Sequence, residues 1–140
     1  MTNKIHITWE QFHNDTKDLC NKIKQAGNFN KIITVSRGGL IPAGIVAYEL
    51  DIRDTSVVNI RSYNGEDKLE KVEVFGFDGQ ADENTLVIDD LSDTGRSINI
   101  LRQLFPKARQ VTVYTKTTST QKPDIYTKEM PNKWIVFPWD

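Results

Sequence analysis

The stretch TLVIDDLSDTGRSI, residues 85 to 98, joins an aliphatic run to three carboxylates and a turn of small residues. The aliphatic run predicts a buried strand, and the apolar spacing of residues 96–105 predicts a helix after the turn. Within the turn, Gly95 allows backbone angles closed to other residues, so successive N–H groups can form a concave anion site. Thr94 and Ser97 add hydroxyl donors, and the helix adds the positive end of its dipole. The stretch therefore predicts a phosphate-binding loop between a strand and a helix.

Strand-like and helix-like segments alternate over the rest of the chain. A T-W-E-Q capping box with Thr8 as N-cap opens a helix whose apolar face ends near Gly27. Pro42 suits the first turn of a second helix. Residues 64–84 form a polar excursion with a hairpin around KVEVFGF. The predicted face of the first helix is Trp9, Phe12, Leu19, Cys20, Ile23 and Ala26, and the predicted strands are residues 4–8, 31–36, 56–63, 85–90 and 110–116.

This alternation predicts an α/β fold with a mainly parallel central sheet flanked by helices. Ligands of such sheets lie beyond the carboxyl ends of the strands. Ser36–Gly39, Asp89–Gly95 and Lys116 all occupy predicted strand ends. We therefore expect three strands to converge on one site.

Composition limits the class of protein. At 140 residues, with 38% hydrophobic and 26% charged residues, the chain fits one globular domain. Its net charge of -1 favours neither nucleic acid nor an anionic membrane as a partner. No apolar run approaches the roughly 20 residues that cross a bilayer, and the N-terminus lacks an apolar signal core, so we expect a cytoplasmic protein. Cys20 is the only cysteine, which excludes intramolecular disulfides and multi-cysteine zinc sites.

Asp89 and Asp90 need a different explanation from the phosphate loop, because carboxylates repel a phosphate. They can accept hydrogen bonds from sugar hydroxyls or hold a magnesium ion with its waters. Neither a G-x-x-x-x-G-K-[ST] nor a G-x-G-x-x-G motif occurs in the chain, which argues against P-loop and dinucleotide sites. Phosphate, ribose and Mg²⁺ together indicate a phosphorylated sugar as the ligand.

Three stretches resemble motifs of the type I phosphoribosyltransferases. LVIDDLSDTGRS (86–97) resembles their phosphoribosyl-pyrophosphate (PRPP) motif, and VSRGGLIPAG (35–44) resembles their pyrophosphate loop. KWIVFPWD (133–140) resembles the purine-contacting segment of the bacterial xanthine-guanine enzymes. The resemblance implies one phosphoribosyltransferase domain over residues 1–140, with a hood or flexible loop at residues 63–84 over the site.

The same resemblance implies an enzyme of purine salvage. Such enzymes transfer the 5-phosphoribosyl group from PRPP to a 6-oxopurine (guanine, xanthine or hypoxanthine), giving the nucleoside 5′-monophosphate and pyrophosphate. They use Mg²⁺ and are usually dimers or tetramers, so we expect a homo-oligomer. The protein's work is to hold the ribose, neutralise the leaving pyrophosphate and place the base in line. The sequence leaves the preference among the three bases open.

Matching these motifs residue by residue implies roles for single side chains. Asp93 is the candidate catalytic acid/base near N7 of the purine, and Asp90 is the better candidate for contact with Mg²⁺. Lys116 would donate to the purine 6-oxygen, Trp134 would stack on its ring, and the Ile135 carbonyl would accept from the 2-amino group. The residues implied in PRPP binding are Ser36, Arg37, Gly38, Lys68, Asp89, Asp90, Leu91, Ser92, Asp93, Thr94, Gly95, Arg96 and Ser97.

The resemblance also implies specific features of the pyrophosphate loop and of the hood loop. The family's pyrophosphate loop, matched by Ser36, Arg37 and Gly38, often contains a non-proline cis peptide. The hood loop of the purine enzymes usually offers an arginine to the pyrophosphate, whereas the nearest basic residue here is Lys68, followed by Lys71. Lysine presents a point charge instead of a bidentate fork, so the pyrophosphate would be held less specifically.

Two other functions stay open at the level of sequence. A non-catalytic regulator that binds PRPP or a nucleotide would share the fold and the phosphate loop. Such a regulator should carry a basic face or an added nucleic-acid-binding segment, for which the chain has neither length nor charge. A phosphoribosyltransferase for a pyrimidine or for orotate would share the loop but would need another base-binding end.

Overall fold

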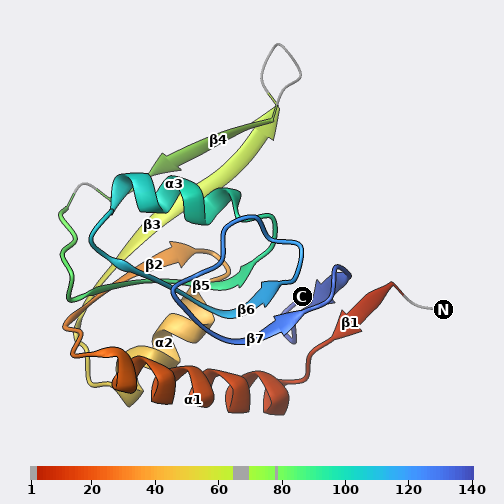
Figure 1. Cartoon of the computed structure of the whole chain (residues 1–140), viewed down its shortest axis with the longest axis horizontal. Coiled ribbons are helices and arrows are strands. Elements are labelled where there is room, and N and C mark those ends of the chain that lie inside the picture. The colour runs from red at the N-terminus through yellow and green to blue at the C-terminus, as the bar shows by residue number, and fades with distance from the viewer. Residues whose placement is uncertain (1–2, 65–69, 78) are drawn as a thin grey trace.

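The computed structural model of the protein describes residues 3–64, 70–77 and 79–140. Helices and strands alternate along these residues, as the sequence predicts (Figure 1). The described elements are, in chain order, β1 (Lys4–His6), α1 (Trp9–Ala26), β2 (Lys31–Ser36), α2 (Leu40–Glu49), β3 (Asp54–Asn64), β4 (Glu70–Phe75), β5 (Thr85–Ser92), α3 (Arg96–Leu104), β6 (Arg109–Lys116), β7 (Ile125–Met130) and β8 (Trp134–Val136).

The central sheet contains six described strands in the order β4-β3-β2-β5-β6-β7. β4 runs antiparallel to β3, and the other neighbouring pairs are parallel. β1 and β8 form a separate parallel pair that joins the two ends of the chain. The prediction of an α/β fold with a mainly parallel sheet is confirmed.

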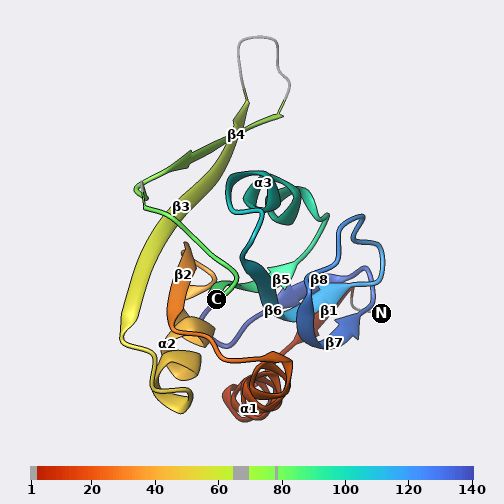
Figure 2. The same cartoon turned by 60° about the vertical axis from the view of Figure 1, so that its left-hand side comes forward.

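Helices cover both faces of this sheet, with α1 and α2 on one side and α3 on the other (Figures 1 and 2). Neighbouring residues of β2 show the division, because Ile32 packs in the cluster below α1 and α2 while Ile33 packs in the cluster below α3. Both side chains are fully buried. A strand covered on both faces reads as a continuous apolar run, which explains the composition of β2.

Several element boundaries agree with the local signals in the sequence. The Thr8 hydroxyl accepts a hydrogen bond from the Gln11 N–H at 3.1 Å, and α1 ends before Gly27. Strand β5 continues to Ser92, two residues past its predicted end at residue 90. The whole acidic pair therefore lies inside the strand and not in the loop that follows it.

The predicted buried face of α1 is partly wrong. Trp9 is 55% exposed, and Ala26, the last helical residue, is also exposed. Trp9 lies in the first turn, where the ring of Trp139 covers it on one side only, with ring centroids 5.9 Å apart. The remaining predicted face residues are buried: Phe12, Leu19, Cys20 and Ile23.

The edge strand β4 and its neighbour β3 form an antiparallel pair that projects from the body of the molecule (Figures 1 and 2). An ion pair between Arg61 Nη2 and Glu73 Oε2 at 2.9 Å joins the two strands. The hairpin predicted around KVEVFGF is therefore present at β4. Lys68, the predicted hood residue, lies outside the described residues, so its role stays a prediction.

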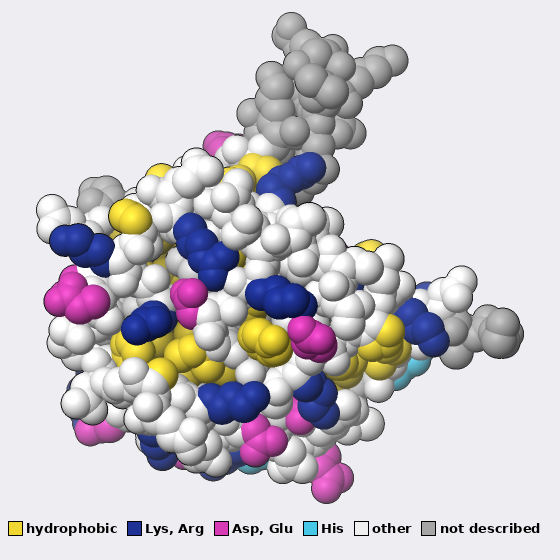
Figure 3. Space-filling view, in the orientation of Figure 1, with side chains coloured by type: hydrophobic (Ala, Val, Ile, Leu, Met, Phe, Trp, Pro, Cys, Tyr) yellow, Lys and Arg dark blue, Asp and Glu magenta, His cyan; other side chains and the backbone are white. Residues whose placement is uncertain are grey.

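Charged side chains of both signs are interspersed on the face of the molecule shown in Figure 3. No basic patch spreads over that face, in keeping with the net charge of -1. In the part of the chain that the structure describes, no helix combines the length and the apolar character needed to span a membrane.

Candidate active site

The carboxyl ends of three neighbouring parallel strands meet at one edge of the sheet. β2 ends at Ser36, β5 at Ser92 and β6 at Lys116, and the order β2-β5-β6 places these ends side by side. The predicted convergence of strand ends is confirmed. The Ser36–Arg37 peptide bond is cis, as the resemblance implies for the loop after β2.

The loop after β2 lies directly against the acidic pair on β5. A Cβ atom placed on Gly38 would lie 2.6 Å from Asp90 Oδ2, so a glycine is needed to leave room for that carboxylate. The Gly39 N–H closes the turn by donating to the Val35 carbonyl at 2.8 Å. A hollow of about 640 Å³ opens beside this contact, between the loop, α2 and the C-terminal segment, and its lining is Arg37, Gly38, Leu40, Ile41, Asp90, Phe137, Trp139 and Asp140.

The two neighbouring carboxylates of β5 lie in an unfavourable electrostatic setting. The Asp90 N–H donates to Asp89 Oδ1 at 2.8 Å. Burial raises the pKa of the Asp89 carboxyl well above its ordinary value, and the charge of Asp90 raises it further. Burial also raises the pKa of Asp90, although its own hydrogen bonds partly oppose that shift. Because neither carboxylate forms an ion pair among the described residues, a bound cation would relieve this charge.

This pair of carboxylates fits Mg²⁺, which prefers carboxylate and water oxygens as ligands. Nowhere among the described residues do three His, Cys, Asp or Glu side chains gather as a metal-binding group. A magnesium ion would therefore take only one or two protein oxygens here. Waters and oxygens of the bound ligand would complete its coordination.

Asp89→Asn is expected to raise the thermal unfolding midpoint of the metal-free protein at pH 7. Between pH 3.8 and the raised pKa of Asp89, the folded protein holds a proton that the unfolded chain has lost, so stability falls as pH rises. Asparagine removes this cost, and its advantage should disappear below pH 3.8. Unfolding scans in EDTA would test this. A lower midpoint for the variant at pH 7 would contradict the assigned direction.

A matched control is available on the surface. The hydrogen bond from Lys122 lowers the pKa of Glu129, so this carboxylate is favoured in its charged form. Glu129→Gln should therefore shift the midpoint at pH 7 slightly downward, opposite in sign to Asp89→Asn.

The loop after β5 forms a small cradle at the start of α3. Gly95 has a φ of 94°, in the left-handed region that favours glycine, and α3 begins at the next residue. The Arg96 N–H donates to Thr94 Oγ1 at 3.3 Å. An anion such as a phosphate would meet the N-terminal end of the helix here. The cradle encloses about 80 Å³ and is lined by Asp89, Leu91, Ser92, Asp93, Thr94, Gly95, Ser97 and Ile98.

The side chains of this loop face in different directions. Ser92 is buried, and its hydroxyl lies 2.9 Å from Ser119 Oγ and donates to the Gln121 carbonyl at 3.1 Å. Its side chain therefore holds the loop to a neighbouring segment, which leaves its backbone for a ligand. Thr94 and Arg96 are exposed at the rim of the cradle.

Lys116 and Asp93 meet at the edge of the same cradle. Lys116 Nζ lies 3.0 Å from Asp93 Oδ1, and the exposed fractions of the two side chains are 7% and 55%. The lysine is thus enclosed by the protein, while the carboxylate reaches solvent. One cationic donor and one anionic acceptor stand side by side next to a phosphate-sized hollow.

Comparison with protein families identifies the class of protein that carries this site. The model of the phosphoribosyl transferase domain matches residues 8–140. The chain belongs to this family. A xanthine-guanine phosphoribosyltransferase of Desulfotalea psychrophila is 40% identical over 136 residues, which cover 96% of this chain and 84% of the relative. The enzyme of the same name from Nitratidesulfovibrio vulgaris is 37% identical over 135 residues, covering 96% and 83%.

Solved structures of phosphoribosyltransferases share the whole fold. A purine phosphoribosyltransferase from Pyrococcus horikoshii has a TM-score of 0.88 and 29% sequence identity, covering 99% of this chain and 95% of that one. A xanthine-guanine-hypoxanthine phosphoribosyltransferase from Helicobacter pylori has a TM-score of 0.84 and 25% identity, covering 97% and 93%. The type I phosphoribosyltransferase fold is therefore confirmed.

Two of the predicted base-binding residues of this phosphoribosyltransferase, Trp134 and Ile135, lie on the short strand β8. Trp134 is 66% exposed, so its ring is available to a ligand. The Trp134 N–H donates to the Asn3 carbonyl at 3.0 Å, and the Val136 carbonyl accepts from the Ile7 N–H at 2.9 Å. Because backbone groups alternate in direction along a strand, the carbonyl of the intervening Ile135 faces away from β1. This is the group expected to accept from a 2-amino group.

Sequence reasoning missed part of the larger hollow. The sequence assigns no individual role to Phe137, Trp139 or Asp140. Phe137 does stack on Trp139, with centroids 4.7 Å apart and an interplanar angle of 8°, but both rings also line the hollow. The Asp140 carboxylate accepts from the Phe137 N–H at 2.8 Å. No local pattern in the sequence marks these three residues as part of the hollow, because their place in it follows from the tertiary fold.

Proposed function

We propose that this phosphoribosyltransferase acts in purine salvage, transferring the 5-phosphoribosyl group from PRPP to a 6-oxopurine in the presence of Mg²⁺. The observation that carries the proposal is the contact of Lys116 Nζ with Asp93 Oδ1 at 3.0 Å, beside the phosphate cradle. In a 6-oxopurine, the 6-oxygen and N7 lie on one edge of the ring system. The ammonium can donate to the oxygen while the carboxylate accepts from an N7–H group.

PRPP would occupy the strand ends in a single orientation. The cradle at residues 93–97 binds its 5′-phosphate, and Asp89 and Asp90 accept hydrogen bonds from the ribose hydroxyls. The loop at residues 36–38 receives the pyrophosphate, where Arg37 adds a positive charge. Asp90 would hold a Mg²⁺ ion, whose positive charge would balance that of the leaving pyrophosphate.

The base would complete the reaction from the side of β8. Trp134 stacks on the purine, which is held in its N7–H form with N9 facing the anomeric carbon. N9 forms the bond to C1′ as the bond from C1′ to the pyrophosphate oxygen breaks, and Asp93 takes the proton from N7. The Ile135 carbonyl favours bases with a 2-amino group, because hypoxanthine leaves that acceptor unpaired.

The relatives support the choice of base. The enzymes from Desulfotalea psychrophila and Nitratidesulfovibrio vulgaris are named for xanthine and guanine, and the structure from Pyrococcus horikoshii is named as a purine enzyme. A cytoplasmic location belongs to the same proposal and rests on the sequence.

The decisive experiment offers PRPP and Mg²⁺ with guanine, xanthine, hypoxanthine, adenine or uracil in separate reactions. Nucleoside monophosphate should form with the 6-oxopurines and not with adenine or uracil, and EDTA should stop the reaction. Chromatography of the products would rank the three 6-oxopurines. Absence of product with every base, while PRPP still binds, would favour a regulator. Product with uracil or adenine would overturn the roles of Lys116 and Trp134.

We also propose that the protein is a homo-oligomer that buries the outer face of α2. Tyr48 is 92% exposed and Leu40 46% exposed on a helix whose other residues are apolar except for Glu49, which pairs with Lys17. Asp51 and Arg53 lie next to this face, with Oδ1 and Nε 3.8 Å apart, and both side chains are exposed. Neighbouring charges of opposite sign allow two copies related by a two-fold axis to pair reciprocally.

Tyr48→Asp is therefore expected to dissociate the assembly, because it replaces the most exposed aromatic ring of this face with a charge. Sedimentation velocity would measure the change. Leu104→Asp is the matched control, since Leu104 is an exposed apolar residue (50%) on α3, across the sheet. A wild-type protein that sediments as a monomer would refute the proposed interface.

A further inference from the structure

The loop between β6 and β7, residues 117–124, forms the back wall of the phosphate cradle. The Thr120 N–H and hydroxyl both donate to the Thr94 carbonyl, at 3.0 and 2.9 Å. A Cβ atom on Gly95 would lie 2.5 Å from the Gln121 backbone nitrogen, so the two segments touch without a gap. The Ser92 hydroxyl adds its bond to the Gln121 carbonyl. The shape of the cradle therefore depends on where residues 119–121 lie.

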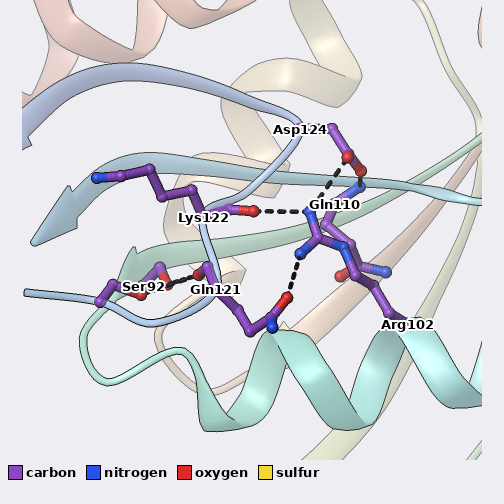
Figure 4. Close-up of polar contacts among 7 residues, drawn as sticks. Ser92, Arg102, Gln110, Gln121, Lys122 and Asp124 are labelled. Atoms are coloured by element: carbon purple, nitrogen blue, oxygen red, sulfur yellow. Dashed lines mark hydrogen bonds and ion pairs between the residues drawn. The ribbon is translucent and has the colours of Figure 1, made fainter.

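Arg102 of α3 fixes the far part of this loop. Its Nη1 donates to Gln121 Oε1 at 2.9 Å, and its Nη2 donates to the Lys122 carbonyl at 2.6 Å and to Asp124 Oδ1 at 3.1 Å. Figure 4 shows the guanidinium group between these acceptors, while the Lys122 side chain points away from it. Three acceptors from three residues thus converge on one side chain.

The loop is anchored at its other end to the sheet. Asp124 Oδ2 accepts from the Gln110 N–H at 2.7 Å, and the Asp124 N–H donates to the Gln110 carbonyl at 2.7 Å (Figure 4). The Asp124 carboxylate therefore bridges Arg102 and the start of β6. The side chains of Arg102 and Asp124 are only 32% and 31% exposed, so the pair is partly shielded from water.

An arginine is needed for this arrangement. Its planar fork presents several fixed donors, whereas a lysine has one ammonium group that cannot reach three separated acceptors at once. Arg102 lies in the last turn of α3, and the first turn of the same helix forms the cradle. The guanidinium group is engaged by Gln121, Lys122 and Asp124, and Arg102 is not among the residues that line the cradle.

We propose that Arg102 is a positioning residue for the 5′-phosphate site: by holding residues 121–124 against α3, it keeps the back wall of the cradle in place. This inference rests on the proposed function, since it takes the cradle to bind the 5′-phosphate of PRPP. It assigns no contact between Arg102 and the ligand. Loss of the arginine should weaken ligands that carry a 5′-phosphate and spare ligands that do not.

The test compares Arg102→Lys with the wild-type protein by calorimetric titration in the presence of Mg²⁺. We expect PRPP and GMP, which both carry a 5′-phosphate, to bind about tenfold more weakly, because charge-assisted hydrogen bonds behind the cradle are lost. Pyrophosphate, which uses the loop after β2, should bind as before. Steady-state kinetics should show the same split, with KM for PRPP raised more than KM for the base.

Two further variants show whether the effect of Arg102→Lys comes from the lost contacts to the loop, from a change of charge near the cradle or from a general loss of folding. Lys122→Gln removes a positive charge from the same loop without touching the guanidinium contacts, since Lys122 Nζ pairs with Glu129 Oε1 at 2.7 Å. It should bind all three ligands like the wild type. Asp124→Asn should weaken PRPP and GMP as Arg102→Lys does, and the double variant should be no worse than the stronger single one.

Equal affinity of Arg102→Lys and wild type for GMP and PRPP would overturn the inference. So would a parallel loss of pyrophosphate binding, which would indicate a general disturbance of the fold. Failure of the proposed function is a separate outcome, because it would appear as absence of nucleotide formation by the wild-type protein, whereas these titrations need no turnover.

Discussion

Asp93→Asn is expected to lower kcat for nucleotide formation by about 100- to 1000-fold, with little change in PRPP affinity. Asparagine matches aspartate in shape but cannot take the N7 proton as the new glycosidic bond forms. Asp93 is 55% exposed, and its carboxylate does not support the core, so the fold should persist. Lys116 loses an anionic partner in the variant, which should raise KM for the base. Single-turnover and steady-state assays with guanine would measure both effects.

The control for this experiment is Glu129→Gln, because it also removes the carboxylate of a lysine ion pair, at 2.7 Å from Lys122 Nζ, but on the strand β7 and outside the lining of the phosphate cradle. It should leave kcat unchanged. Full turnover by Asp93→Asn would exclude an acid/base role for Asp93. Loss of PRPP binding together with turnover would instead indicate that the Asp93 side chain is needed to keep the PRPP site in shape.

The proximity of Asp93 and Lys116 is a part of the site that the sequence alone could predict. The two residues lie far apart in the chain, and no local pattern relates them. They were expected to meet only because each follows a buried strand, and parallel strands end at the same edge of a sheet. The adjacency of β5 and β6 brings their side chains within 3.0 Å. Strand identity and fold class are thus enough to predict that these two side chains lie close together, whereas their roles follow from the family resemblance alone.

Residues whose environment depends on distant segments could not be predicted in this way. Trp9 has the spacing of a buried helical residue, but it lies in the first turn of α1 beside Trp139 and stays 55% exposed. Arg102 reads as an ordinary polar position on the last turn of an amphipathic helix, and its acceptors come from a loop with no motif. The surroundings of Trp9 and Arg102 depend on segments that are distant in the sequence, and helical periodicity carries no information about those segments.

Gly38→Ala is expected to lower kcat/KM for PRPP by about 100-fold, since displacements of about 1 Å at a reacting site have effects of this size. The thermal unfolding midpoint of the variant should stay close to that of the wild type. The added Cβ would lie 2.6 to 2.7 Å from all three atoms of the Asp90 carboxyl group. That group is the end of a flexible side chain, so it can rotate away without unfolding the protein. The rotation removes Asp90 from the position in which it would meet the ribose and Mg²⁺.

The neighbouring glycine provides the matched comparison. A Cβ on Gly39 would lie 2.4 Å from the Ile88 carbonyl oxygen and 2.6 Å from that of Val35, and these backbone atoms cannot rotate away. Gly39→Ala should therefore reduce the free energy of unfolding by about 1–3 kcal/mol, as overpacking does elsewhere. Activity loss without destabilisation at Gly38, and destabilisation at Gly39, would support Asp90 as a ligand-binding carboxylate. If Gly38→Ala keeps its activity, the contact between the loop and Asp90 has no part in PRPP binding, and the Mg²⁺ site must be sought at Asp89.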